Sequence, residues 1–427
     1  VLFNKLEFKG DWNNRPRDMA SLTRWISRTF ETTVNWQVIN LEAPVREWHD
    51  APILYISGSK APKFTDEDIE KLRQYVWQGG TIFSVTECHG GEFRKSMRDV
   101  YKKLFPSYPL TEVDPKDDLY HIYFKKFPAR MSLWTISNGI RPLVIHTDDD
   151  LSLDWQLQRM AMAKPSFDIA ANIFMYVTDK QLRSRGVSLW PEAPAAKPAR
   201  TVKIARIRHE GNCDPEPLAY ERFARMLLKE TQTGLEVVGP IEISKLADSG
   251  AKLATLTGTG AFAFSSSDKE ALKKFVESGG TLLIDPAGGA ACGGAAFDKS
   301  ARKLLAELYG LDRLRPLAML SPLFQRKGLE IERVWYRPIT RKKLSNAKTA
   351  NLQAVVSADG RLGVLYSSED LTAGLVGYPA ASLDGYDPGG SQQPNSAYQI
   401  LRNIVLMVAD ETSKPPPAAS QPVTAEK

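Results

Sequence analysis

The sequence predicts an α/β protein made of two tandem flavodoxin-like domains, each with a doubly wound parallel sheet. Three observations support this fold class. β-prone runs alternate with amphipathic helices along the chain, which is the pattern of parallel βαβ units. The two halves of the chain repeat each other with a period far longer than the ~20–50 residues of a solenoid repeat. A Pro/Ala-rich stretch, 191–200, separates the halves as a linker would.

The repeat is clearest around two cysteines. The β-prone run 81–85 leads through Glu87-Cys88-His89-Gly90-Gly91 into an amphipathic helix. The run 281–284 leads through Ala291-Cys292-Gly293-Gly294 into a similar helix, whose positions lie 204 residues further along. We therefore match Cys88 with Cys292. A strand, a tight turn of small residues and a helix have the geometry of a nucleophile elbow, which lifts one side chain above the sheet beside free helix N–H groups.

Four segments are expected along the chain. A length of 427 residues exceeds one typical core, which favours more than one domain. We place the first domain at 1–180, a Pro/Ala linker at 181–201, a second and diverged domain at 202–410, and a disordered Pro/Ala-rich tail at 411–427.

The elements of the first half follow from local patterns. Strands are expected at 1–8, 38–41, 53–56, 81–85 and 143–146, helices after Pro16, Thr65 and Gly91 and over 167–177, and a possible edge strand at 120–124. Thr65 to Asp68 has the spacing of a capping box, and Gly79-Gly80 ends the helix that it opens. The second half repeats this order from Val202.

Composition excludes several classes of protein. The chain is 43% hydrophobic and 25% charged, which is ordinary for a globular protein, and its net charge of +6 is spread among acidic residues. A nucleic-acid partner is therefore not expected. The three cysteines form neither a disulfide framework nor a zinc motif, so we expect no metal and no cofactor. No apolar run approaches the ~18 residues of a membrane span. The chain begins at Val1, which we interpret as processing or cutting from a longer protein, with any signal or anchor outside this chain.

A known family is visible at the matched positions. Its marks are the turn Gly10-Asp11-Trp12, the Gly58 turn, the helix end at Gly79-Gly80, the cysteine turn before Phe93, and Arg141 leading a strand towards Asp150-Leu151. Together they resemble the bacterial domain-of-unknown-function 4159 family, in two copies. The resemblance implies a fold similar to class I glutamine amidotransferases and an occurrence in envelope and membrane-associated proteins, which favours the periplasm or cell envelope. It implies no assigned activity.

Cys88 is the candidate nucleophile. The helix N-terminus and a neighbouring histidine would both favour its thiolate, and His121 or His146 would act as the base. Against catalysis, neither histidine is repeated in the second half, His89 is replaced by Gly293, and Thr86 stands where an elbow has its first glycine. The alternative is that a small thiol simply fits where the turn packs on the sheet.

A ligand site is the other candidate, formed at the carboxyl ends of the strands. The residues proposed for it are Asp11, Trp12, Gly58, Glu87, His89 and Arg141. Asp11 could instead cap the next helix, with Trp12 covering the domain edge. Arg141 could instead form an ion pair that ties the sheet end to the following helix.

Two classes of function follow from these residues. The favoured one is a non-catalytic tandem module that binds a protein partner or a small ligand in a bacterial envelope-associated assembly, with an interface between its domains. The alternative is a cysteine-dependent hydrolase or amidotransferase whose nucleophile, Cys88, is present only in the first domain.

Overall fold

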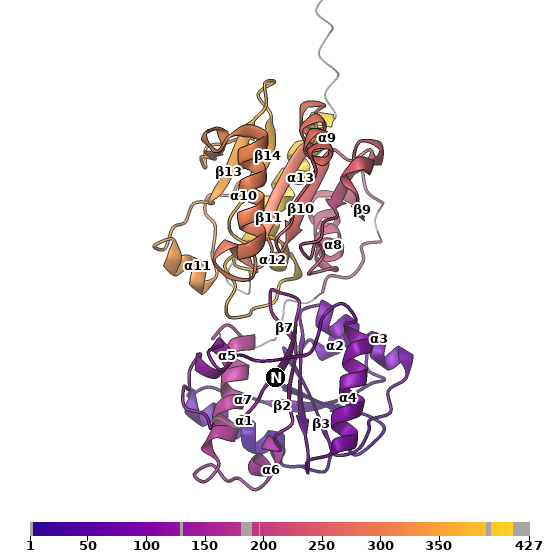
Figure 1. Ribbon diagram of the computed structural model, residues 1–427, viewed down its shortest axis with the longest axis vertical. Coiled ribbons are helices and arrows are strands. Elements are labelled where there is room, and N and C mark those ends of the chain that lie inside the picture. The colour runs from indigo at the N-terminus through magenta and orange to yellow at the C-terminus, as the bar shows by residue number, and fades with distance from the viewer. Residues whose placement is uncertain (1–2, 129–130, 181–189, 196, 390–393, 413–427) are drawn as a thin grey trace, which may run out of the picture.

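The computed structural model describes residues 3–128, 131–180, 190–195, 197–389 and 394–412. It contains two α/β domains, each built on a seven-stranded sheet and stacked end to end along the long axis (Figure 1). Parts of the expected linker, 181–189 and 196, lie outside the described residues, as does 413–427 of the expected tail.

The two sheets share one strand order. The first sheet runs β2-β1-β3-β4-β7-β6-β5, and the second, read from its corresponding edge, runs β9-β8-β10-β11-β14-β13-β12. The first five strands of each series are parallel and have the flavodoxin-like order, and the last two are antiparallel. The first-sheet strands are β1 (Phe3–Glu7), β2 (Trp36–Asn40), β3 (Ile53–Gly58), β4 (Thr81–Thr86), β5 (Thr111–Glu112), β6 (Trp134–Ser137) and β7 (Pro142–Thr147). Those of the second are β8 (Arg200–Ile207), β9 (Thr233–Ile241), β10 (Leu253–Gly258), β11 (Thr281–Pro286), β12 (Arg315–Pro316), β13 (Leu352–Val356) and β14 (Leu362–Ser367).

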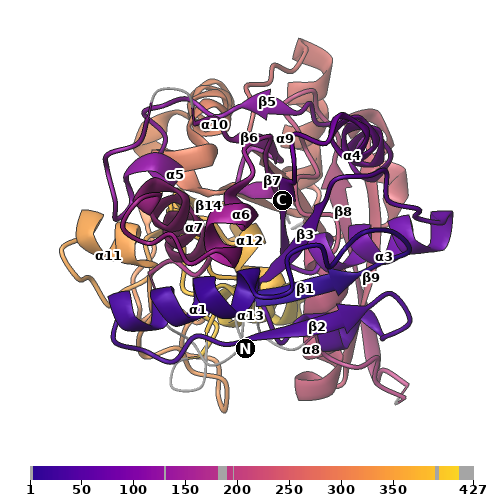
Figure 2. The same cartoon turned by 90° about the horizontal axis from the view of Figure 1, so that it is seen from below.

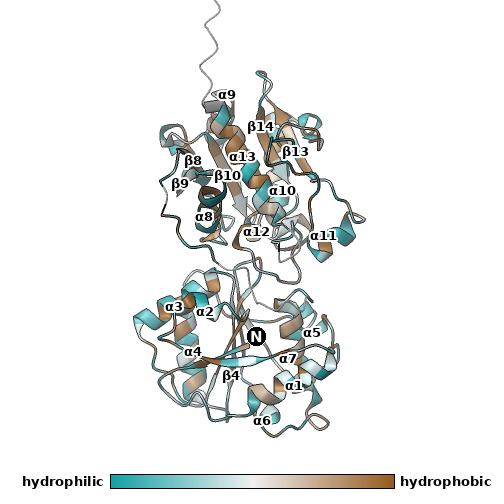
Figure 3. Ribbon diagram, turned by 180° about the vertical axis from the view of Figure 1, so that it is seen from behind, coloured by the Kyte–Doolittle hydropathy of each residue, from teal (hydrophilic) through white to brown (hydrophobic). Residues whose placement is uncertain are grey.

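Helices cover both faces of each sheet and turn their apolar sides inward (Figure 3). The first domain has α1 (Asp18–Thr29), α2 (Val45–Trp48), α3 (Asp66–Trp77), α4 (Gly91–Leu104), α5 (Asp118–His121), α6 (Leu151–Gln156) and α7 (Lys164–Val177). The second has α8 (Ala219–Thr231), α9 (Ser266–Glu277), α10 (Ala295–Tyr309), α11 (Pro338–Lys343), α12 (Thr372–Val376) and α13 (Ser396–Thr412), with short helical turns η1 (Ile243–Lys245), η2 (Ala247–Ser249), η3 (Gly289–Gly293) and η4 (Leu311–Arg313). Two separate apolar clusters fill the two faces of each sheet.

The helix before the fourth strand of each domain shows how local sequence sets these elements. Thr65 caps α3 in a capping box with Asp68, as expected, and Ser265 repeats the motif with Asp268 at α9. After α3, Gly80 lies so close to the Tyr75 ring that an added Cβ would be 2.3 Å from it. The glycine pair therefore lets the chain turn directly into β4.

The expected edge strand at 120–124 is wrong. The chain there forms α5, because the Asp117 carboxylate accepts the Leu119 N–H at 2.8 Å and starts a helical turn. Leu119 and Tyr120 are both buried, although neighbouring residues of a strand would point to opposite faces. The antiparallel edge is formed by β6 and β5 instead.

The two domains meet head to tail. The turn between β6 and β7, at the amino end of β7, contacts the loop that follows β8 at the carboxyl end of the second sheet: Asn138 donates to the Pro215 carbonyl at 2.7 Å and to Glu216 at 2.9 Å. Figure 1 shows that β7 begins beside the second domain, below α12, and that α6, which follows β7, lies at the far end of the molecule. The carboxyl edge of the first sheet thus faces away from the second domain. Within the described residues, no helix is long and apolar enough to cross a membrane.

Candidate functional site

The cysteine turn at the carboxyl edge of the first sheet has a left-handed backbone. Cys88 and His89 follow β4 with φ angles of 51° and 54°, which few residues other than glycine adopt. The Glu87 N–H donates to the Gly58 carbonyl at 2.9 Å, and the Cys88 N–H donates to Asp150 Oδ2 at 2.8 Å. These bonds fix the turn and leave the Cys88 side chain exposed.

The neighbour of the thiol is an arginine. Arg15 Nη2 lies 3.1 Å from Cys88 Sγ and 3.3 Å from Asp150 Oδ2. Burial alone lowers the pKa of Arg15, but the charges of Asp150 and Cys88 outweigh burial and raise it. A guanidinium carries only donors, so it stabilises a thiolate and cannot take a proton from the thiol.

Asp11 joins two loops at this edge. Its Oδ2 accepts the N–H groups of Ser59 and Lys60, both at 3.1 Å, and the Asn14 amide at 2.9 Å, and it also accepts the Ser59 hydroxyl. Burial acts to raise the pKa of Asp11, but these hydrogen bonds lower it overall. The expected cap is wrong, because α1 begins after Arg17 and Asp11 binds the loop that follows β3.

Polar atoms without partners lie beneath this loop. Glu87 is fully buried, and its Oε2 accepts the Asn14 amide at 2.9 Å. Glu87 Oε1 and the hydroxyls of Ser57 and Thr86 are also buried, and none makes a hydrogen bond of ordinary length and angle, although the Ser57 hydroxyl lies close enough to Glu87 to lower its pKa. Burial raises the pKa of Glu87 against the opposing effects of Asn14 and Ser57. Since most buried polar groups in proteins are paired, these atoms suit a water or a small polar ligand.

The two candidate bases, His146 and His121, form hydrogen bonds with residues other than Cys88. His146, buried on β7, contacts Ser84 Oγ through Nδ1 at 2.6 Å and Asp148 Oδ1 through Nε2 at 3.1 Å. His121, on α5, contacts the Pro115 carbonyl through Nε2 at 2.6 Å. Within the described residues, no histidine is hydrogen-bonded to Cys88, and no group of three His, Cys, Asp or Glu side chains is placed to hold a metal ion.

The remaining predicted residues are divided between the two ends of the sheet. Trp12 is half-buried against the core beside the Asp11 loop, and Gly58 packs so closely on Phe93 that a Cβ would lie 3.0 Å from the ring. The exposed His89 stands next to Cys88 in the turn. Arg141 lies apart from all of them, before β7 at the amino edge, where it donates to the Val76 and Gly80 carbonyls at 2.5 and 2.9 Å.

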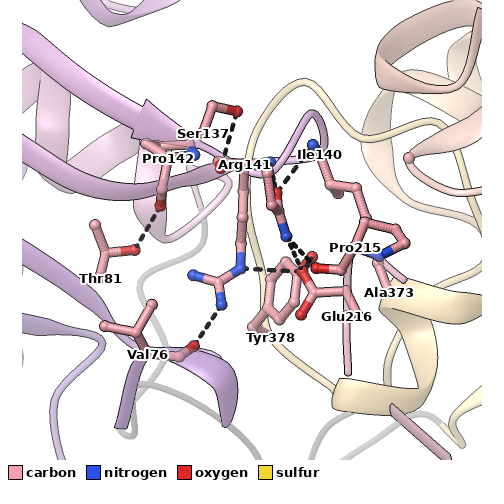
Figure 4. A network of polar contacts seen from close by, with 12 residues as sticks. Val76, Thr81, Ser137, Ile140, Arg141, Pro142, Pro215, Glu216, Ala373 and Tyr378 are labelled. Atoms are coloured by element: carbon pink, nitrogen blue, oxygen red, sulfur yellow. Dashed lines mark hydrogen bonds and ion pairs between the residues drawn. The ribbon is translucent and has the colours of Figure 1, made fainter. Parts of the chain in front are cut away.

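Arg141 also joins the two domains rather than binding Asp150. Its Nε lies 3.4 Å from Glu216 Oε1, and both side chains are almost entirely buried (Figure 4). The guanidinium lies over the Tyr378 ring at 4.4 Å, and the Tyr378 hydroxyl donates to Glu216 at 2.7 Å. The expected tie to the following helix is therefore wrong, because Arg141 and Asp150 stand at opposite ends of β7.

Gly288, and not Cys292, occupies the place of Cys88. The Ala287 N–H donates to the Gly258 carbonyl at 3.0 Å, and the Gly288 N–H donates to Asp370 Oδ1 at 3.0 Å. These two bonds repeat those made by Glu87 and Cys88 in the first domain.

The extra residues of the second copy lie after this point. Gly288 and Gly289 have φ angles of 80° and 82°, and η3 then carries the chain to Gly294, the residue before α10. Matching Cys88 with Cys292 is thus wrong, whereas the duplication is confirmed by the shared strand order.

The carboxyl edge of the second sheet is covered by the first domain. The side chain of Ile140 belongs to the apolar core of the second domain and is 5% exposed. A Cβ on Gly288 would lie 3.5 Å from Ile140, and one on Gly293 would lie 2.1 Å from the Gly139 carbonyl. Asn212, the counterpart of Asp11, donates to the Asn138 carbonyl at 2.8 Å. The turn 138–141 thus fills the position where the first domain leaves its own edge open.

Sequence reasoning missed Arg15, Asn14 and Ser59. Arg15 and Glu216 hold the same place in their domains, three residues before α1 and α8. The change from a positive to a negative side chain at this position is the sequence signal that could have identified Arg15. Arg15 binds within its own domain, whereas Glu216 binds Arg141 of the other domain.

The family is shown by a sequence model that matches nearly the whole chain. The model described as "Domain of unknown function (DUF4159)" matches residues 2–178 and 203–408. The chain therefore belongs to this family and contains two tandem copies of its domain. A comparison with curated proteins finds no match.

Solved structures resemble the chain only distantly. The N-terminal domain of mmIFT52 is 14% identical with a TM-score of 0.26, over 49% of this chain and 97% of that one. A protein assigned as a GMP synthase component from Thermoplasma acidophilum is 13% identical with a TM-score of 0.22, over 40% and 94%. One assigned as a phosphosugar isomerase from Silicibacter pomeroyi DSS-3 is 8% identical with a TM-score of 0.16, over 66% and 74%.

Proposed function

We propose that the chain is a non-catalytic tandem module that binds a small polar ligand or a partner at the carboxyl edge of its first sheet. The second domain serves as the platform on which the first is held. The observation that carries this proposal is the guanidinium of Arg15 at 3.1 Å from Cys88 Sγ, in the position where a cysteine hydrolase needs a base.

The polar groups of this edge support binding. Asp150 is satisfied by Arg15 and the turn, and Asp11 by the Ser59 loop, whereas Glu87 keeps one buried oxygen without a hydrogen bond. A ligand with N–H or O–H donors would complete the coordination of that carboxyl group. We also propose, from the family resemblance, an envelope-associated assembly as the setting.

The alternative function is a hydrolase or amidotransferase that uses Cys88. The left-handed turn at Cys88 and its exposed thiol favour this alternative, because a nucleophile elbow has both features. A working enzyme would need a general base to activate the water that releases an acyl group from the thiol, and the neighbouring Arg15 cannot act as one.

Turnover assays separate the two functions. With p-nitrophenyl acetate, we expect the Cys88 thiolate to attack the ester carbonyl and release at most one equivalent of p-nitrophenolate, without sustained turnover. With L-glutamine, we expect no release of ammonia. Steady hydrolysis of either compound that is lost in Cys88→Ser would contradict the proposal.

Binding is tested on the same thiol. L-Glutamine and L-glutamate serve as probes that carry amide, ammonium and carboxylate groups, and slower alkylation of Cys88 at millimolar concentrations reports occupation of the edge. Glu87→Gln should weaken the protection, since it changes the unsatisfied carboxyl group. If neither probe protects Cys88, the small-ligand part of the proposal is contradicted.

A further inference from the structure

A donor-rich groove lies between α1 and β2, far from the cysteine turn. It measures about 450 Å³ and is open to solvent. The groove is lined by Ala20, Thr23, Arg24, Ser27, Arg28, Thr32, Thr33, Val34, Asn35 and Trp36. No carboxylate is among these residues.

The two arginines of this groove are free of ion pairs. Arg24 and Arg28 are exposed, and among the described residues neither side chain has a carboxylate or hydrogen-bond partner within bonding distance. Most other arginines of the first domain form ion pairs, as Arg15 does with Asp150 and Arg98 does with Asp148. Two unpaired guanidinium groups in one groove favour an anionic occupant, because they supply planar, bidentate donors.

The groove continues into a free strand edge. β2 is the outermost strand of the first sheet and, in the part of the chain that the structure describes, pairs only with β1 (Figure 2). Val38 lies on the same face of β2 as Trp36 and is 43% exposed. An extended peptide segment can pair with an exposed edge of this kind through backbone hydrogen bonds.

We propose that the groove between α1 and β2 binds an extended peptide segment of a partner protein that carries carboxylates on alternate residues. Arg24 and Arg28 are four residues apart on a helix, which places them about 6 Å apart along its axis. Alternate side chains of a strand are about 6.6–6.8 Å apart on one face. A strand added beside β2 therefore presents every second side chain at the spacing of the two arginines.

Fluorescence anisotropy at low ionic strength tests this proposal with a labelled ten-residue peptide of alternating Glu and Thr. We expect saturable binding that weakens with added salt. Arg24→Ala and Arg28→Ala should each weaken binding by roughly 3- to 10-fold. Arg17→Ala is the matched control: this exposed arginine lies just before the same helix but outside the groove, and its loss should change the affinity by less than about 2-fold.

Three probe peptides or polymers complete the design. A peptide with Gln in place of Glu should bind at least 10-fold more weakly, and so should one that is N-methylated at every backbone nitrogen, which keeps the carboxylates but has no N–H to donate to β2. Single-stranded DNA should bind more weakly than the Glu peptide. The proposal is overturned by equal binding of the Glu and Gln peptides, by equal binding of the N-methylated peptide, by tighter binding of the DNA, or by an Arg17→Ala effect as large as that of Arg28→Ala.

Discussion

The carboxyl edges of the two sheets are built from corresponding strands, but one edge is open and the other is covered by the neighbouring domain. In the first domain the edge is open, and Arg15, Cys88 and Asp150 form a contact among themselves. In the second domain Glu216 stands in the place of Arg15, and it binds Arg141 from the turn that covers the edge. A single duplicated fold has therefore given one edge that stays open and one that holds the neighbouring domain.

This difference arises from a small number of side chains. Gly288 replaces Cys88 at the point where Ile140 packs on the covered edge, and Asn212 replaces Asp11, which lets an amide donate across the interface. The loop backbone is otherwise retained, since the turn after the fourth strand keeps its hydrogen bonds in both domains. Loss of an open edge and gain of a domain interface thus have the same cause.

The largest effect on stability is expected when the ion pair between Arg141 and Glu216 across the interface is broken. Arg141→Met leaves Glu216 buried without its cation, which we expect to lower the free energy of unfolding by roughly 3–5 kcal/mol. Arg361→Met is the matched control, because Arg361 binds the Val276 and Gly280 carbonyls as Arg141 binds Val76 and Gly80, but pairs with Asp359 at the surface. Equal losses in urea denaturation would show that the interdomain pair contributes nothing.

A smaller effect on the free energy of unfolding is expected from the pH dependence of Asp285 at the covered edge. Asp285, which stands where the first domain has Val85, accepts the N–H groups of Leu371 and Thr372 at 3.2 and 3.1 Å. Burial, together with the charge of Asp370, raises the pKa of Asp285 to about 7. The folded protein therefore holds a proton that the unfolded chain has lost, so stability falls as pH rises from about 4 to about 7.

Asp285→Asn should remove this loss. The difference in unfolding free energy between the variant and the wild type should grow in favour of the variant by up to about 1.4 kcal/mol per pH unit between pH 5 and pH 7, and then level off. Chemical denaturation at pH 5, 6, 7 and 8 measures it. A difference that does not change with pH would contradict a raised pKa at this position.

The sequence predicted the parts of the fold that depend on local patterns. The alternation of strands and helices and the capping box at Thr65 follow from hydrophobic periodicity and cap chemistry, which act within a few residues. The pairing of Cys88 with Cys292 failed because the run 288–294 has glycines on both sides of an insertion, so two alignments fit equally well. Only the backbone hydrogen bonds distinguish them.

The candidate site was predicted less completely than the fold. Asp11, Glu87, His89 and Cys88 lie at one edge, because the carboxyl ends of parallel strands meet there. His121, His146 and Arg141 were not brought to it, since their positions depend on contacts between residues far apart in the sequence. The covered edge depends on the turn 138–141 meeting the loop at Glu216, and no local pattern encodes such a meeting.

The central claim, an open edge in the first domain and a covered one in the second, is tested most directly by the alkylation rates of two native thiols. Cys88 is exposed and borders Arg15, whereas Cys292 is half-buried beside the interface, where burial and Asp384 raise its pKa to about 11. Only the thiolate reacts, so iodoacetamide at pH 8 should modify Cys88 at least about 10-fold faster than Cys292, as followed by peptide mass spectrometry. Equal rates, or faster modification of Cys292, would show that the second edge is as open as the first and would contradict this account.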